Sequence, residues 1–265
     1  MAAALRAAGV RTDVYLTEGP TDRLECLADA ERAHELVVAV GGDGTIAAVL
    51  ASLPKEVPLA VLPSGTANVL GIDLKLPRSV EGVTRMILSG RTTLIDVARV
   101  NDRLSFLVTG VGIDGWIVRD LAGRRRGPIT KWSYVASTLR TLRRWRPPRL
   151  SVEIDGEPLG HEVAWVLASN LVGYGGLLRL GHERLLDDGR FEVYLFADSS
   201  RLALARFAAR GLARRLPGAG CRMVRARRVR IESDEPVPYE VDGDYGGLTP
   251  VDIEVTGEQF RILVP

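Results

Sequence analysis

The chain has 265 residues and a mass of 28.8 kDa, the size of one large or two small domains. Hydrophobic residues make up 46% and charged residues 26%, which excludes a largely disordered chain and predicts a sizeable core. No segment approaches the roughly 18 apolar residues of a membrane-spanning helix, and no secretory signal is evident. Cys26 and Cys221 lack disulfide-rich or metal-binding spacing, so we expect a protein of the reducing cytoplasm.

The formal net charge of +2 is unevenly distributed along the chain. Arg119–Arg149 contains ten Lys or Arg residues and one acid, and Arg201–Arg230 contains ten Arg residues and no acid. Such segments can bind an anionic membrane, nucleic acid or nucleotide phosphates. The alternative is that they form solvated helix faces, and because only three of the 35 basic residues are Lys, a skewed composition explains part of the pattern.

The first third of the chain alternates helical and strand patterns. Two short apolar runs, Leu36–Val40 and Leu59–Leu62, predict strands buried on both faces. The other elements predicted here are a helix over Met1–Ala8, a strand over Thr12–Thr17, and helices from Pro20–Thr21, over Ile46–Leu53 and from about Asn68. This βαβα order predicts a parallel sheet with helices on both faces.

After Asp96 the pattern changes to short strands separated by Gly, Pro and Asp turns, which is typical of an antiparallel domain. The predicted strands are Val97–Val100, Leu104–Thr109, Leu150–Ile154, Glu162–Ala168, Phe191–Phe196, Cys221–Ile231, Val251–Val255 and Arg261–Val264, with helices over Ile129–Arg146 and Arg201–Arg215. We therefore expect domains at 1–96 and 97–265, with room for the last residues to pack back on the first domain.

The most informative motif is Gly41-Gly42-Asp43-Gly44-Thr45, between a predicted strand and a helix. The glycines allow a bulky ligand close to the backbone, and a helix N-terminus offers N–H groups to a phosphate. A carboxylate beside a phosphate suits a bound Mg²⁺, a combination that phosphoryl transfer requires. A plain strand-to-helix turn with a surface Asp is the alternative.

A second turn, Pro63–Asn68, follows the next strand in the same topological position. Successive parallel strands end at the same edge of a sheet, so both turns are expected to line one crevice. Thr66 and Asn68 could bind phosphate or ribose oxygens, or one of them could simply cap the next helix.

Three further segments carry acids beside glycines. Gly110–Gly115 matches the dinucleotide fingerprint G-x-G-x-x-G, but it lies in the β-rich part without the required βαβ context, so we discount that interpretation. Asp242 and Asp244 would point the same way in an extended strand, where repulsion could raise one pKa and create a proton acceptor. The alternative is a type I′ hairpin turn. Leu185–Arg190 is either a hairpin turn or an oxygen site for a hard cation.

Together these segments resemble the diacylglycerol kinase catalytic-domain superfamily, which includes bacterial diacylglycerol kinases and sphingosine kinases. The motifs are GGDGT at 41–45, PSGTAN at 63–68, GVGIDG at 110–115, NLVGYGG at 170–176, LLDDGRFEVYLF at 185–196 and VDGD at 241–244. GGDGT is shared with NAD kinases and phosphofructokinases, whereas the later motifs favour the lipid kinase branch.

The resemblance implies a Rossmann-like α/β domain, similar to NAD kinase and phosphofructokinase, followed by an antiparallel β-sandwich, with the active site between them. Asp244 occupies the position of the family's proton acceptor, Asp43 and Asp242 are implied as further catalytic acids, and Asp114 joins their network around Mg²⁺. The residues implied to contact ATP are Thr17, Gly41, Gly42, Asp43, Gly44, Thr45, Ile46, Ala47, Gly65, Thr66 and Asn68. A structural-metal loop is implied at Leu185, Asp188 and Arg190, with Leu and Arg contributing backbone carbonyls.

The sequence departs from the family pattern in three places. The family's first strand, with its Asn-Pro-x-Ser-Gly phosphate loop, is not found, which suggests either a misassigned start or an incomplete nucleotide site. Asp244 replaces a Glu, which shortens the proton acceptor by one methylene and changes its reach by about 1 Å. Asn68-Val69 stands where many bacterial members have Asn-Asp.

We therefore predict ATP- and Mg²⁺-dependent transfer of the γ-phosphoryl group to a lipid hydroxyl, of diacylglycerol or a sphingoid base. The alternatives are an NAD kinase-like enzyme with a soluble substrate and a weakly active or inactive relative that binds nucleotide or lipid.

Trp132, Tyr134 and Trp145 lie among the cations of Lys131–Arg149, a composition suited to a membrane interface. With the Arg201–Arg215 helix, this segment is expected to bring a cytoplasmic protein to an anionic bilayer; two packed amphipathic helices with solvated arginines are the alternative. Nucleic acid is not expected as a partner, and a homodimer is one option for assembly.

Overall fold

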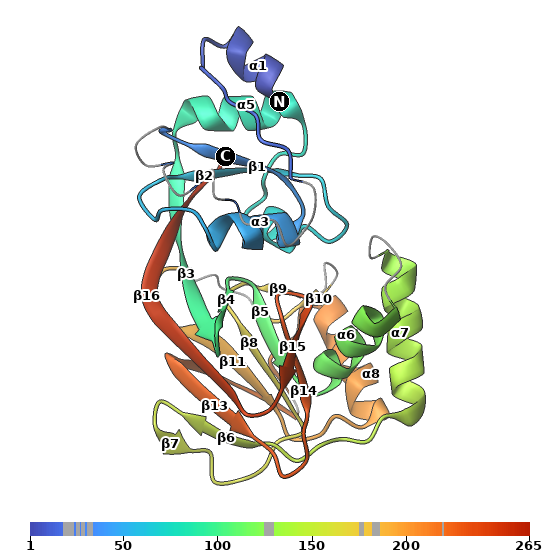
Figure 1. The fold of residues 1–265 in the computed structure, drawn as a ribbon. Coiled ribbons are helices and arrows are strands. Elements are labelled where there is room, and N and C mark those ends of the chain that lie inside the picture. Colours follow the sequence, from blue (N-terminus) through green and yellow to red (C-terminus); the bar gives the residue numbers. More distant parts are fainter. Residues whose placement is uncertain are drawn as a thin grey trace. The chain divides into compact units, whose positions relative to one another are not determined.

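The computed structural model describes residues 1–17, 24, 27, 30, 34–124, 130–174, 178–181, 186–218 and 220–265 (Figure 1). The chain divides into two compact units. The N-terminal unit comprises Met1–Ile95 together with Glu258–Pro265, and the C-terminal unit comprises Asp96–Gly257. The last eight residues of the chain are therefore part of the first unit.

The N-terminal unit contains the expected parallel sheet. Strand β1 (Val37–Gly41) runs parallel to β2 (Leu59–Pro63), and the end of β16 (Val251–Leu263) runs parallel to β2 on its other side. All five residues of β2 are buried, which explains its uninterrupted apolar sequence. In the part of this unit that the structure describes, the helices are α1 (Ala2–Ala7), α3 (Asp43–Leu50), α4 (Val69–Asp73) and α5 (Val80–Ser89).

Two predictions for the start of the chain have different outcomes. The strand predicted over Thr12–Thr17 is wrong: the segment is irregular, and the side chain of Leu16 is 90% exposed. Without a neighbouring strand or a core to cover it, alternation of side chains does not produce a strand. The helix predicted from Pro20–Thr21 begins outside the described residues.

The C-terminal unit contains the expected antiparallel sandwich. One sheet has the order β12-β11-β8-β5-β14-β15, and the second joins β16, β13, β6 and β7, with β3 and β4 attached through β16. The strands are β3 (Thr92–Val100), β4 (Arg103–Ser105), β5 (Val108–Val111), β6 (Ser151–Ile154), β7 (Glu157–Pro158), β8 (Trp165–Ser169), β9 (Gly173–Tyr174), β10 (Leu178–Arg179), β11 (Phe191–Phe196), β12 (Cys221–Ala226), β13 (Arg228–Glu232), β14 (Pro238–Val241) and β15 (Asp244–Leu248). Aliphatic residues of both sheets, such as Val193 and Val229, form the core of this unit.

Three helices, α6 (Ile113–Arg124), α7 (Lys131–Arg144) and α8 (Arg201–Leu212), lie side by side in this unit (Figure 1). A second apolar cluster joins them to the six-stranded sheet and includes the stacked rings of Trp165 and Phe196, whose centroids are 4.2 Å apart. All four tryptophans of the chain belong to the C-terminal unit.

Several strand boundaries differ from the prediction for physical reasons. The segment Leu104–Thr109 divides into β4 and β5, because its central N–H groups bind a side chain instead of a neighbouring strand. The segment Cys221–Ile231 divides into β12 and β13, which belong to different sheets. The two strands predicted near the C-terminus are one, β16. Helix α6 was not predicted at all.

Candidate active site

The turns that follow β1 and β2 meet through their backbones. The N–H of Ser64 donates to the carbonyl of Gly41 at 2.9 Å. A Cβ atom placed on Gly42 would lie 3.0 Å from the Cα of Gly65, and one placed on Gly65 would collide with the Cα of Gly42. Only glycine at both positions allows this approach, so the structure brings the two glycine-rich turns together at one edge of the sheet.

Asp43 connects the two turns. It is the first residue of α3, yet its carboxylate accepts hydrogen bonds from the N–H groups of Val69 at 3.0 Å and Leu70 at 3.3 Å, in the first turn of α4. Burial raises the pKa of Asp43, and these backbone donors oppose the shift. The carboxylate thus caps one helix while it begins another.

Asn68 braces its own turn. It is buried, with a left-handed backbone (φ 50°), and its side-chain oxygen accepts from the N–H of Gly65 at 2.9 Å. Its side-chain amide donates to the carbonyl of Gly65 at 2.7 Å. In this conformation the Asn68 side chain shapes the turn and makes no cap hydrogen bond to α4.

The other residues implied to contact ATP lie in different surroundings. Gly44 and Thr45 are in the first turn of α3, and Ile46 points into the core, where its side chain is 1% exposed. Ala47 follows it in the same helix, Thr66 is exposed on the second turn, and Thr17 is exposed in the irregular segment near the N-terminus.

In the C-terminal unit, Asp114 is a buried carboxylate in the first turn of α6. It accepts hydrogen bonds from the indole N–H of Trp165 at 2.5 Å and from the hydroxyl of Tyr174. Burial raises the pKa of Asp114 to about 6, although both hydrogen bonds oppose the shift.

The glycines around Asp114 serve packing. A Cβ atom on Gly110 would lie 2.7 Å from a carboxylate oxygen of Asp114, and one on Gly115 would collide with the backbone of Pro238. Gly110 lies within β5, a strand of an antiparallel sheet. The dinucleotide fingerprint at Gly110–Gly115 therefore lies outside a βαβ unit, which agrees with the decision to discount dinucleotide binding there.

Sequence reasoning missed Glu240. It lies in β14, where it is 3% exposed, and its carboxylate accepts from the N–H of Gly243 at 2.7 Å. Burial and the charge of Asp114 raise the pKa of Glu240 well above its usual value. The available signal was an acidic residue inside a fully buried strand, Pro238–Val241.

The VDGD segment is a hairpin turn. Asp242 and Gly243 both have left-handed backbones, with φ of 52° and 88°, and connect β14 to β15. The type I′ hairpin is therefore confirmed and the extended arrangement is wrong: the Asp242 side chain is partly buried and hydrogen-bonded, whereas the Asp244 side chain is 58% exposed. Arg103 is the neighbouring cation, with its Nη2 3.9 Å from Oδ2 of Asp244.

The Asp242 carboxylate organises the segment between β4 and β5. It accepts from the hydroxyl of Ser105 at 2.9 Å and from three backbone N–H groups, those of Phe106, Leu107 and Val108, each at 3.0 Å. Burial raises the pKa of Asp242 to about 6, against the effect of these donors. In this conformation Asp242 holds the hairpin to the neighbouring chain segment.

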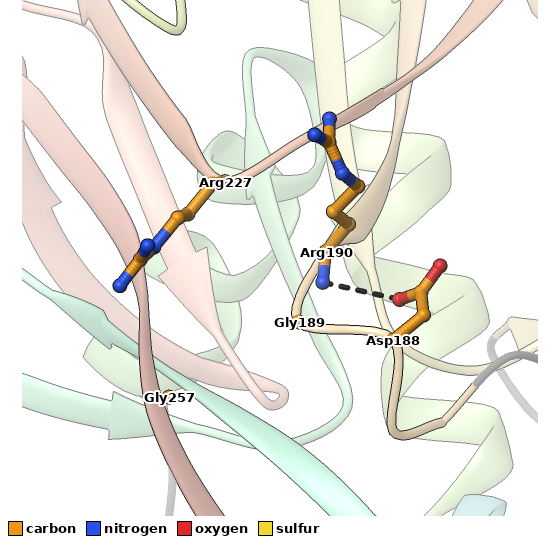
Figure 2. Close-up of a pocket in the computed structure, with 5 residues that line it drawn as sticks. All are labelled: Asp188, Gly189, Arg190, Arg227 and Gly257. Carbon is orange, nitrogen blue, oxygen red and sulfur yellow. Dashed lines mark hydrogen bonds between the residues drawn. The ribbon is translucent and has the colours of Figure 1, made fainter.

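The loop implied to bind a structural metal borders a cavity of about 310 Å³ (Figure 2). The cavity is lined by Asp188, Gly189, Arg190, Arg227 and Gly257. A carboxylate oxygen of Asp188 accepts from the backbone N–H of Arg190 at 3.1 Å, while the Arg190 guanidinium extends away from it and lies 3.7 Å from Asp155. Leu185 lies outside the described residues. Within the described parts of the chain, no group of three or more His, Cys, Asp or Glu residues is placed to hold a metal ion.

Comparison with known families defines the class of protein. Residues 1–100 match the model of the diacylglycerol kinase catalytic domain, and residues 108–264 match the YegS C-terminal NAD kinase beta sandwich-like domain. The chain belongs to the diacylglycerol kinase catalytic-domain superfamily.

Curated relatives agree with this membership. The chain is 25% identical to the diacylglycerol kinase of Bacillus subtilis, with 97% of this chain and 87% of that protein covered. It is 26% identical to the diacylglycerol kinase of Staphylococcus haemolyticus, with 98% and 81% covered. The names of these relatives support the conclusion that the chain is a kinase.

Solved structures share the fold. A crystal structure of a diacylglycerol kinase from Bacillus anthracis has a TM-score of 0.74 at 23% identity, covering 95% of this chain and 85% of that one. An NAD kinase from Archaeoglobus fulgidus, solved in complex with ATP, has a TM-score of 0.53 at 15% identity, covering 99% and 87%. The predicted fold class, a Rossmann-like domain followed by a β-sandwich, is confirmed.

Proposed function

We propose that this chain is an ATP- and Mg²⁺-dependent lipid kinase that transfers the γ-phosphoryl group to a lipid hydroxyl, of diacylglycerol or a sphingoid base. The observation that carries the proposal is the backbone contact between Gly42 and Gly65, which joins two glycine-rich turns at the carboxyl ends of neighbouring parallel strands. A nucleotide fits such a place because side chains do not hold it away from the backbone.

In this proposal the N-terminal unit binds the nucleotide. The first turn of α3, with Gly44 and Thr45, offers N–H groups to the phosphates. Asp43 is the carboxylate proposed to hold Mg²⁺, which commonly takes one or two protein carboxylates and completes its shell with water and phosphate oxygens. A single protein carboxylate, that of Asp43, is therefore enough for the proposed Mg²⁺ site, because water and phosphate oxygens supply the other ligands. When bound, Mg²⁺ would offset negative charge on the transferring group.

In the C-terminal unit, Asp244 is the proposed proton acceptor because its carboxylate is exposed. It would take the proton of the lipid hydroxyl as that oxygen bonds to the γ-phosphorus, and the oxygen bridging the β- and γ-phosphates would leave with ADP. The buried carboxylate of Glu240 and the partly buried carboxylate of Asp242 hold the hairpin that carries Asp244. They are positioning residues in this proposal, and Asp114 lies in α6, which packs against β14 and β15.

Transfer of radiolabel from γ-labelled ATP tests the proposal. Wild type, Asp43→Ala and the exposed-turn control Asp102→Ala are incubated with diacylglycerol or a sphingoid base in mixed micelles. We expect incorporation by wild type and Asp102→Ala, and a loss of at least a hundredfold in Asp43→Ala. Equal incorporation by all three would exclude Asp43 from the site.

Two further arms separate the alternatives. Incorporation of radiolabel into NAD without detergent would instead support a soluble-substrate kinase. This alternative is tested because the chain shares its fold with an NAD kinase. Stabilisation by ATP without any transfer would support a non-catalytic relative.

The remaining parts of the proposal concern location and assembly. We propose that the protein works peripherally at the cytoplasmic face of an anionic membrane, where a lipid substrate resides; none of the helices in the described part of the chain is long and apolar enough to span a bilayer. A structural metal held by Asp188 with the carbonyls of Leu185 and Arg190, and a homodimer, stay predictions.

A further inference from the structure

The outward face of α7 is apolar. Trp132, Val135 and Leu139 have side chains that are 82%, 47% and 57% exposed. Their spacing of three and four residues places them in one arc of the helix, about 60° wide at 100° per residue. Exposed Arg143 continues the same arc one turn further along. We call these four residues the α7 outer face.

The inward side of α7 is polar where it meets α6. The buried hydroxyl of Ser137 donates to the carbonyl of Ile117 at 3.1 Å and to Asp120 at 2.5 Å. The guanidinium of Arg140 donates to the same Asp120 carboxylate at 2.7 Å. A surface helix normally directs its apolar side inward and its polar side to water, and α7 has the reverse arrangement where it meets α6, although Leu142 near its end packs against the second apolar cluster.

Positive charge lies at one end of the apolar arc: Arg143 is on the arc, whereas Arg144 lies about 100° around the helix from Arg143, towards the side of Ser137. Arg143, Arg144 and Arg146 are exposed, and none forms an ion pair with another described residue. An exposed apolar strip beside arginines that form no ion pair within the described residues complements a surface that has anionic head groups over hydrocarbon.

The C-terminal end of α7 is fixed to its own unit. The guanidinium of Arg201, at the start of α8, donates to the carbonyls of Leu142 and Arg143, each at 2.8 Å. Trp145 is buried, and its indole N–H donates to the carbonyl of Ser199 at 2.6 Å. Trp145 is therefore a core residue and not, as the sequence suggested, part of the membrane-facing composition.

From this arrangement we infer that the α7 outer face docks on an anionic lipid bilayer, with Trp132, Val135 and Leu139 entering the interface and the arginines contacting head groups. The inference rests on the proposed function in one respect: docking of the α7 outer face would bring a lipid kinase to a substrate that stays in the membrane. It concerns binding alone, so it can be tested without turnover.

Co-sedimentation with vesicles tests the inference on the full chain. Phosphatidylglycerol-containing and pure phosphatidylcholine vesicles are compared at low salt. We expect the wild type to prefer the anionic vesicles, Leu139→Ser to bind them about tenfold more weakly, and Arg143→Glu with Arg144→Glu to remove the preference.

Matched controls exist on α5, in the other unit. Leu88 is 58% exposed, against 57% for Leu139, and Arg85 is exposed like Arg143. Leu88→Ser and Arg85→Glu should leave vesicle binding unchanged. Equal loss in Leu88→Ser and Leu139→Ser, or wild-type binding by Leu139→Ser, would overturn the inference.

Tryptophan fluorescence gives a second readout that misfolding does not imitate. Anionic vesicles should shift the emission of the wild type to shorter wavelength and brominated lipids should quench it, whereas Trp132→Phe should lose most of both effects. If vesicles leave the emission unchanged while Leu139→Ser alters the sedimentation coefficient of the free protein, the α7 outer face joins two copies of the chain and the inference fails. Radiolabel transfer to a short-chain, water-soluble diacylglycerol decides the proposed function separately.

Discussion

The acids of this protein differ in their surroundings more than in their sequence contexts. Asp43, Asp114 and Asp242 each lie next to glycine, yet one caps α4, one binds two aromatic side chains and one holds a chain segment. Asp244, also beside a glycine, is exposed to solvent. Burial and hydrogen-bond donors, which depend on the tertiary fold, therefore decide what each carboxyl can do.

Asp114 should make stability depend on pH. Its pKa is raised from 3.8 to about 6, so the folded protein holds a proton that the unfolded chain releases. Stability from this group is fully present below about pH 4 and is lost as the pH rises to about 6, by roughly 3 kcal/mol. Asp114→Asn should remove this part of the slope in urea unfolding between pH 4 and 6.5, monitored by tryptophan fluorescence. The same slope in variant and wild type would contradict the assignment.

Gly65 should tolerate no side chain. In Gly65→Ala the new Cβ would collide with the Cα of Gly42, so we expect the N-terminal unit to lose about 1–3 kcal/mol of unfolding free energy. Gly44→Ala is the control, because open space surrounds Gly44 within α3 and alanine favours a helix by up to about 1 kcal/mol. Hydrogen exchange in β1 and β2 measures the stability of the N-terminal unit in both variants. Equal protection in the two variants would show that the turns move apart at no cost.

At the residue scale, sequence reasoning located the glycine turns but not their contacts. That the turns would meet followed from the rule for parallel strands. The hydrogen bonds from Val69 and Leu70 to Asp43 could not be predicted, because they join residues 26 and 27 positions apart. Glu240 was missed because its importance depends on Asp114, which only the folded sheet brings near.

At the element scale, the start of α8 stabilises the end of α7. The last carbonyls of a helix lack partners within the helix, and here Arg201 supplies N–H donors for two of them. The basic segments of the sequence therefore serve two purposes: Arg201 is structural, while Arg143 and Arg144 are exposed.

Removal of the Arg201 guanidinium should weaken this end of α7. We expect Arg201→Ala to lower the free energy of unfolding by about 1–2 kcal/mol, because two charge-assisted hydrogen bonds are lost. Arg206→Ala, an exposed position on the same helix, should change it by less than about 0.5 kcal/mol. Urea unfolding followed by circular dichroism distinguishes them. A similar effect of both substitutions would count against the cap.

Element prediction succeeded where one local pattern decided the structure. β11 has the predicted bounds, Phe191–Phe196, because all of its residues are buried in a central strand. Helix α6 was missed because its first residues, Ile113–Gly115, belong to the glycine-rich segment Gly110–Gly115, which reads as a loop. The division of Cys221–Ile231 depends on two separate sheets, a property that no local pattern contains.

For the whole molecule, β16 determines how the two units depend on each other. Its first half pairs with β13 in the C-terminal unit, and its last residues complete the sheet of the N-terminal unit. Three of those last residues, Phe260, Ile262 and Leu263, are buried.

A chain ending at Gly257 should therefore lose the fold of the N-terminal unit while keeping that of the C-terminal unit. Removal of the three apolar side chains costs more than about 5 kcal/mol, comparable to the stability of a small domain. Hydrogen exchange should show β1 and β2 unprotected and β8 and β11 protected. Normal protection of β2 would mean that residues 258–265 are dispensable.

The placement of the tryptophans has a practical consequence for anyone who follows this protein by its own light emission. All four tryptophans belong to the C-terminal unit: Trp116, Trp132, Trp145 and Trp165. Tryptophan fluorescence therefore does not report unfolding around the glycine-rich turns of the N-terminal unit. Exchange of Phe260 for tryptophan would supply an optical reporter there, since that ring is buried in the N-terminal unit.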